Sequence, residues 1–212
     1  MSAQLPTPVD PLAPEERARA NMYALIGRLF YGAPDADLLA SMSHARDSAA
    51  EAGPPGDLER AWRALQDVCA GALPAALKLE YDTLFVGVGK AEVTPYTSHY
   101  ITHSAPDRHL VELRGLLEGW GLARSAGIFE VEDHVSALCD VMRFLIEEQK
   151  PVSYQRLFFE RYVRPAIVPL TTAVMAAASA AFYTQVAAFV QTFCEVEKAA
   201  FNMDDATSDA FP

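Results

Sequence analysis

Cysteine is scarce in this chain, and no two cysteines stand at the C-x-x-C spacing of a zinc knuckle. The three cysteines are far apart, each among apolar neighbours: Cys69, Cys139 and Cys194. Neither a metal-binding cysteine motif nor a disulfide framework is therefore supported. We expect three buried free thiols, as in proteins of a reducing compartment.

Basic residues are also few. The 212 residues include 28 Asp and Glu against 17 Lys and Arg, which gives a formal net charge of -11. This balance argues against nucleic acid and against anionic membrane surfaces, because both bind proteins rich in Lys and Arg. It favours cationic partners, or simply a solvated acidic surface. With 51% hydrophobic and 21% charged residues, the composition is that of a globular protein.

The N-terminus lacks the basic region and apolar run of a secretory leader. We expect residues 1–13, which are rich in proline, to form a flexible extended lead, and the protein to be cytoplasmic. Residues 165–194 contain no charged side chain and are long enough to cross a bilayer. They are mostly Ala, Thr, Ser and Val, however, and alanine gains little on transfer to lipid. Two close-packed core helices, or one long kinked helix, fit this segment better, so no stable membrane insertion is expected.

Strand-like alternation of apolar and polar residues is nearly absent, and no fixed-period repeat is visible. Helix openings with a proline and acids in the first turn dominate instead, as at Pro14-Glu15-Glu16. The sequence therefore predicts an all-α fold. Helices are expected over about 14–31, 34–42, 57–68, 74–86, 106–119 and 130–146, with the last ones starting at Pro151 and Pro165 and ending near Phe201.

These helices predict one compact domain at residues 14–203. Its subdomains, about 14–120 and 130–203, would be joined by a hinge near residues 121–129, and residues 204–212 would form a frayed acidic tail. Long helices on either side of a hinge are compatible with both a monomer and a domain-swapped dimer.

The most informative stretch is residues 80–100. A helix-like run over residues 80–85 stops at Gly87, and an irregular segment crowded with aromatic rings and hydroxyls follows at residues 95–100. Such a loop is demanding in conformational entropy and poorly suited to simple packing. We therefore expect it to carry a function.

Signatures of catalysis are weak. No Ser or Cys stands in a strand-turn-helix elbow, and the glycines before Lys90 lack the other features of a phosphate loop. One alternative is a small metal-dependent hydrolase built on His99, His103 and His109, with acids drawn from Asp107, Glu112 and Asp133. The segment around Pro95 does not favour a helix, however, and no H-E-x-x-H spacing is present.

Two motifs in order carry a family resemblance. The first is Glu80-Tyr81-x-x-Leu84-Phe85 with Pro95-Tyr96-x-Ser98-x-Tyr100, and the second is Glu130-Val131-Glu132-Asp133-His134. Together they resemble the TorD/DmsD/NarJ-like family of redox-enzyme maturation chaperones, over about residues 15–201. The chain departs from the family pattern at Val131, where proline is usual, at Thr97, where glutamate is common, and at Tyr162 and Ala166 in a late motif.

The resemblance implies a compact all-α chaperone of the cytoplasm that is not an enzyme and uses no cofactor. Members bind the precursor of a molybdenum-containing oxidoreductase, through its twin-arginine signal peptide or another part. They hold the precursor back from export until its cofactor is inserted. Because the C-terminal half diverges, the resemblance does not identify the client.

A twin-arginine signal needs carboxylates for bidentate pairing and an apolar groove with aromatic walls. The residues expected to contact the client are Glu80, Tyr81, Phe85, Pro95, Tyr96, Ser98, Tyr100, Asp133 and His134, with Glu130, Glu132, Trp62 and Trp120 as further candidates. Each also has a structural interpretation. Glu80 could bond the amides of the loop that follows it, Leu84 and Phe85 could belong to the core, and the hydroxyls of residues 95–100 could satisfy buried backbone. Asp133 could be a first-turn helix acid with His134 packed beside it.

Overall fold

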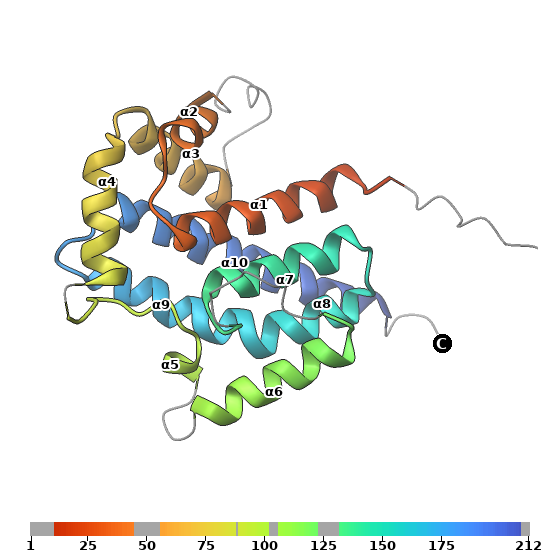
Figure 1. The fold of residues 1–212 in the computed structure, drawn as a ribbon. Helices are drawn as coiled ribbons and strands as arrows, with labels where there is room; N and C mark the ends of the chain where they lie inside the picture. The colour runs from red at the N-terminus through yellow and green to blue at the C-terminus, as the bar shows by residue number, and fades with distance from the viewer. Residues whose placement is uncertain (1–10, 45–55, 88, 102–105, 123–131, 209–212) are drawn as a thin grey trace, which may run out of the picture.

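The computed structural model describes residues 11–44, 56–87, 89–101, 106–122 and 132–208 (Figure 1). This part of the chain is helical, as predicted, and contains no strand beyond an isolated bridge between Tyr96 and His134. The α-helices are α1 Pro14–Tyr31, α2 Ala36–His44, α3 Asp57–Ala70, α4 Pro74–Tyr81, α5 Ser98–Ile101, α6 Pro106–Gly119, α7 Val135–Glu147, α8 Val152–Phe158, α9 Arg164–Ala176 and α10 Phe182–Ser208. Two π-helical turns, η2 Asp82–Val86 and η3 Phe159–Val163, continue α4 and α8.

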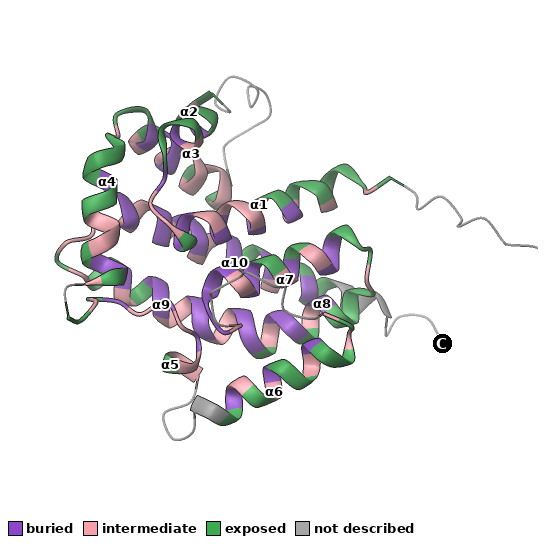
Figure 2. Ribbon diagram, viewed as in Figure 1, coloured by how far each residue is buried: buried purple, intermediate pink, exposed green. Residues whose placement is uncertain are grey.

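The centre of the molecule is a group of long helices, in which α1 packs against α7 and α10 packs against α9 and α3 (Figure 1). Gly27 of α1 makes the first of these contacts close, because a Cβ added there would lie 3.3 Å from Cβ of Cys139 and 3.4 Å from the carbonyl oxygen of Ser136. The buried residues gather on the inner faces of these helices (Figure 2). Among the described residues, the buried apolar side chains form one core cluster, which includes the three thiols as expected.

The shorter helices cover the two sides of this core. Helices α2, α3 and α4 lie together at one end, while α5 and α6 lie on the opposite side, below α9 in the view of Figure 1. The loop from η2 to α5 therefore crosses the molecule from one group to the other. It carries Pro95 and Tyr96 of the first motif.

Several expected boundaries were wrong. Helix α3 begins at Asp57 as expected, with Gly56 as its N-cap, but it continues past residue 68 to Ala70. Helix α7 begins at Val135, later than the expected start between residues 130 and 133. Helix α10 continues past Phe201 to Ser208, so most of the expected tail is helical. The hinge expected near residues 121–129 lies largely outside the described residues.

The uncharged segment 165–194 is divided between α9 and the first half of α10, which pack against each other. This confirms the prediction of two close-packed core helices. In the described part of the chain, no helix combines the length and the apolar character that a membrane span requires.

Candidate functional site

The two sequence motifs meet through backbone hydrogen bonds. The N–H of Thr97 donates to the carbonyl of Asp133 at 2.8 Å, and the N–H of Val135 donates to the carbonyl of Pro95 at 3.0 Å. These bonds flank the antiparallel bridge between Tyr96 and His134. The loop after η2 and the chain entering α7 are thereby held as one unit, which we call the motif junction (residues 94–98 and 133–136).

His134 caps the N-terminus of α7. Its Nδ1 accepts a hydrogen bond from the N–H of Ser136 at 3.1 Å and lies 2.6 Å from the Ser136 hydroxyl oxygen. Because Nδ1 accepts from a backbone amide, the ring proton of a neutral His134 stands on Nε2. The ring meets that of Tyr96 edge to face, with centroids 5.2 Å apart. His134 is thus an N-cap, and the interpretation of Asp133 as a first-turn helix acid is wrong.

Beneath the junction lies a group of buried polar side chains. Asp133 is only 2% exposed, and one of its carboxylate oxygens accepts from the N–H of Ser98 at 3.3 Å. His109 of α6 is also buried, with Nε2 3.4 Å from the hydroxyl oxygen of Thr97 and its ring 5.4 Å from the ring of Tyr162. Burial lowers the pKa of His109, and the negative charges of Asp133 and Glu112 oppose this effect without reversing it. The cluster therefore favours a neutral imidazole at neutral pH.

The solvent-facing part of the junction is aromatic. Tyr96, Ser98 and Tyr100 are half-buried, whereas Pro95 is buried. The hydroxyl of Tyr100 donates to the carbonyl of Thr94 at 2.9 Å, as the structural interpretation of this segment predicted. Burial raises the pKa of Tyr100 to about 12. The rings of Tyr96 and Tyr100 are thus partly open to solvent on a backbone held by hydrogen bonds.

Glu80 lies elsewhere, at the N-terminal end of α10. Its carboxylate accepts hydrogen bonds from the amides of Ala181 at 2.8 Å, Phe182 at 3.2 Å and Tyr183 at 2.9 Å. The structural interpretation in which Glu80 bonds the amides of the loop that follows it is therefore wrong, since its amide partners lie about a hundred residues further on. The carboxylate is a helix cap that fastens α4 to α10.

Tyr81 and Phe85 belong to an aromatic cluster beside Glu80. The Tyr81 hydroxyl donates to the carbonyl of Phe30 at 2.9 Å, and its ring lies 5.2 Å from that of Phe85. Phe85 and Leu84 are both buried, which confirms that they are core residues. Phe85 also packs edge to face against Tyr183, with centroids 5.1 Å apart.

The remaining candidates are dispersed. Glu132 forms an ion pair with Arg114 of α6 at 3.0 Å, Trp62 packs on Phe189, and Trp120 stacks on Tyr154 of α8. Glu130 and His103 lie outside the described residues. His99 is exposed on α5 while His109 is buried, and no cluster of three metal-ligating side chains occurs in the described part of the chain.

Sequence reasoning missed the roles of Thr97 and Ser136. Both are buried polar residues. The amide of Thr97 connects the two motifs and its hydroxyl lies near His109, whereas the amide of Ser136 donates to His134 within the second motif. The only available signal was that Thr97 replaces a glutamate common in the resembled family.

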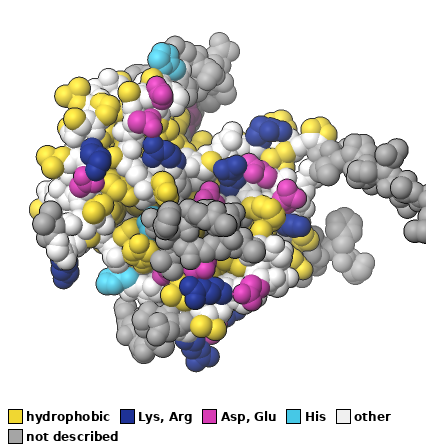
Figure 3. Space-filling model, in the orientation of Figure 1, with side chains coloured by type: hydrophobic (Ala, Val, Ile, Leu, Met, Phe, Trp, Pro, Cys, Tyr) yellow, Lys and Arg dark blue, Asp and Glu magenta, His cyan; other side chains and the backbone are white. Residues whose placement is uncertain are grey.

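On the face seen in Figure 3, described Lys and Arg side chains lie singly among acidic and hydrophobic ones.

Comparison with known proteins gives one similar solved structure and one matching family model. The fold is similar to the crystal structure of a protein assigned to redox enzyme maturation from Archaeoglobus fulgidus, with a TM-score of 0.52 and 18% sequence identity. The similarity covers 92% of this chain and 99% of that one. The family model of the nitrate reductase delta subunit matches residues 51–195, and the chain belongs to this family. This confirms the resemblance drawn from the motifs. No curated protein sequence matches the chain.

Proposed function

We propose that this protein is a cytoplasmic chaperone for a molybdenum-containing oxidoreductase. It binds the precursor of that enzyme, through the signal peptide or the apo-subunit, and keeps it from export until the cofactor is inserted. The observation that supports this most is the motif junction, where Thr97 and Asp133 join two segments that are distant in sequence. Two motifs that are distant in sequence and joined in the structure are best explained when both build one surface.

Within the junction, the exposed and buried residues take different roles. Tyr96 and Ser98, with Tyr100 just beyond the junction, are half-buried and present partly exposed side chains to a bound peptide. Asp133 and His134 are buried, so they brace this surface and do not themselves reach far into solvent. The proposed client-binding role of Asp133 and His134 is therefore one of positioning.

The energetics favour an apolar contact. An ion pair at a half-exposed groove contributes only about 1 kcal/mol. A micromolar complex requires about 8 kcal/mol of net binding free energy, so rings and apolar area must supply most of it. No observation favours the metal-dependent hydrolase, and we do not propose it.

The test is to measure by calorimetry the affinity of the purified chain for a molybdoenzyme precursor from the same organism. The Tyr96→Ala variant should weaken binding by about tenfold, because a buried aromatic contact contributes on the order of 1–2 kcal/mol. Tyr31→Ala is the control, since Tyr31 is a 61% exposed tyrosine that belongs to neither motif. Equal affinity for both variants, with folding intact, would remove the junction from the binding surface.

A further inference from the structure

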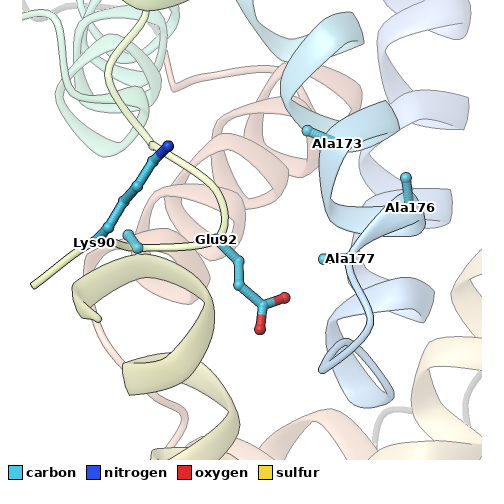
Figure 4. Close-up of a pocket in the computed structure, with 6 residues that line it drawn as sticks. Lys90, Glu92, Ala173, Ala176 and Ala177 are labelled. Atoms are coloured by element: carbon cyan, nitrogen blue, oxygen red, sulfur yellow. The ribbon is translucent and has the colours of Figure 1, made fainter. Parts of the chain in front are cut away.

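An open pocket of about 590 Å³ lies between the loop that follows η2 and the C-terminal end of α9 (Figure 4). Its lining brings together Lys90 and Glu92 from the loop with Ala173, Ala176 and Ala177 from the opposite side. Because the two charges are opposite and the alanines are apolar, the pocket favours no class of ligand. The inward face of α6, in contrast, has a defined chemistry.

Helix α6 lies at the edge of the molecule, below α8 and α9 in the view of Figure 1, and contacts η3 and α8 through one face. This face is a narrow stripe at helical spacing, in which His109 is 5%, Leu113 0% and Leu117 8% exposed. Trp120, directly after the helix, continues the stripe and stacks on Tyr154 of α8. One position of an otherwise apolar stripe therefore holds an ionisable ring.

Two ion pairs also hold α6, and each includes a half-exposed arginine. Glu112 pairs with Arg161 of η3 at 2.8 Å, and Arg114 pairs with Glu132 of the second motif at 3.0 Å. Ion pairs near the surface contribute little to stability. Gly115 lies within the helix with open space beside it, so it lowers helix propensity without allowing a closer contact. A helix attached mainly by one stripe can detach at a lower free-energy cost than the central helices can unfold.

His109 is the sensitive member of this stripe. Its ring packs against that of Tyr162 in η3, with centroids 5.4 Å apart. The charged groups that face the imidazole are Asp133 of the motif junction, Glu112 of α6 itself and Arg161 of η3. Burial is the largest influence and lowers the pKa of His109; the arginine acts in the same direction, and the two carboxylates oppose it. An imidazolium is therefore disfavoured while α6 is docked and favoured once the ring reaches water.

We propose that α6 is a proton-controlled cover: protonation of His109 releases α6 from η3, α8 and the motif junction while the central helices stay folded. Release would expose the ring of Tyr162, which is now 1% exposed, and would remove the His109 ring from beside the hydroxyl of Thr97. Docking is unaffected by pH above about 6.5, the ordinary pKa of histidine, and weakens as the pH falls below that value. The device operates within the chain, so its test needs no client.

The two tryptophans of the chain provide one reporter for α6 and one for the core. Trp62→Phe leaves Trp120, whose stack on Tyr154 reports the docking of α6. Trp120→Phe leaves Trp62, which packs on Phe189 of α10. When the pH is lowered from about 7.5 to about 5, across the ordinary pKa of histidine, the emission of Trp120 should shift to longer wavelength and its quenching by acrylamide should increase. The emission of Trp62 should stay unchanged.

The decisive variant is His109→Leu in the Trp62→Phe chain. Leucine completes the apolar stripe and cannot be protonated, so the emission of Trp120 should be the same at both pH values. His109→Gln gives the same test if the leucine variant does not fold, and His99→Gln, at an exposed histidine, should keep the full shift. The proton-controlled cover is overturned if Trp120 emission does not shift while His109 is present, or if the shift survives its replacement. A simultaneous change of both tryptophans would also overturn it, because the whole chain would then be unfolding.

Discussion

The carboxylate of Glu80 accepts a hydrogen bond from the backbone N–H of Tyr183 at 2.9 Å, across 103 residues of sequence. Ala181 and Phe182 donate to the same carboxylate. Amides at a helix N-terminus have no partner within the helix, and a negative charge there is also favoured by the helix dipole. A residue of the first motif therefore serves as the N-terminal cap of α10.

Replacement of Glu80 by alanine should lower the free energy of unfolding by about 1–3 kcal/mol, because three amides lose their acceptor. Glu80→Gln should lower it less, since the amide oxygen still accepts. Glu59→Ala is the control, because Glu59 pairs with Arg63 on the surface of α3. Urea denaturation measures all three. Unchanged stability of Glu80→Ala, combined with salt-dependent loss of precursor binding, would instead make Glu80 a client contact.

The buried His109 should make stability depend on pH. Its pKa is lowered by burial, so the unfolded chain binds a proton more readily than the native one, and native stability falls as pH drops below about 6.5. The groups that face it are Asp133 and Glu112, which oppose the shift, and Arg161, which adds to it.

Substitution of His109 by glutamine keeps a hydrogen-bonding group near Thr97 but removes the titration. The difference in urea midpoint between about pH 7.5 and about pH 5 should therefore be smaller in His109→Gln than in wild type. The exposed His99 provides the control, and His99→Gln should retain the wild-type difference. An unchanged pH dependence in His109→Gln would show that another group is responsible.

A buried ion pair joins the two ends of the chain. Arg19 of α1 donates to both oxygens of Glu197 of α10, at 2.8 and 2.9 Å, and the Tyr23 hydroxyl donates to the same carboxylate at 2.8 Å. Glu197 is only 2% exposed. Arg19→Leu leaves this charge unpaired and should cost about 3–5 kcal/mol. The double variant Arg19→Leu, Glu197→Leu should be less destabilised than Arg19→Leu alone, and thermal denaturation of both distinguishes this from a simple loss of packing.

Alanine substitutions at two glycines of the loop after η2 distinguish the cost of an unfavourable backbone angle from the cost of a steric clash. Both have positive φ, 66° for Gly87 and 99° for Gly89, but only at Gly87 would a Cβ collide with the neighbouring backbone. Gly87→Ala should therefore lower stability by more than the ~1 kcal/mol expected for an unfavourable φ alone, whereas Gly89→Ala should stay near that figure. An equal loss of stability in the two variants would contradict this, because it would mean that the backbone around Gly87 shifts to accommodate the added Cβ at no further cost.

The sequence predicted the parts of the fold that local chemistry decides. Pro14 opens α1 and Gly32 follows its end, and Gly87 ends η2, as expected from the preferences of proline and glycine. The π-helical turns η2 and η3 were not predicted. Their residues have the composition of ordinary helix, and no local sequence signal marks the wider turn.

The candidate site was predicted less completely. The two motifs were expected to act together, and the structure joins them through Thr97 and Asp133. The sequence could not show that His134 would cap α7, because a capping role depends on where the helix begins. It also could not pair Glu80 with the amides near Tyr183, since no local pattern marks a contact across such a separation.

The most direct test of the central proposal is a calorimetric comparison of two forms of one molybdoenzyme subunit. The purified chain would be titrated with the precursor that carries its leader and lacks cofactor, and with the mature, cofactor-loaded subunit. The account predicts binding to the precursor and at least tenfold weaker binding to the mature form, about 1.4 kcal/mol. Equal affinity for the two forms, or no binding to the precursor, would contradict it.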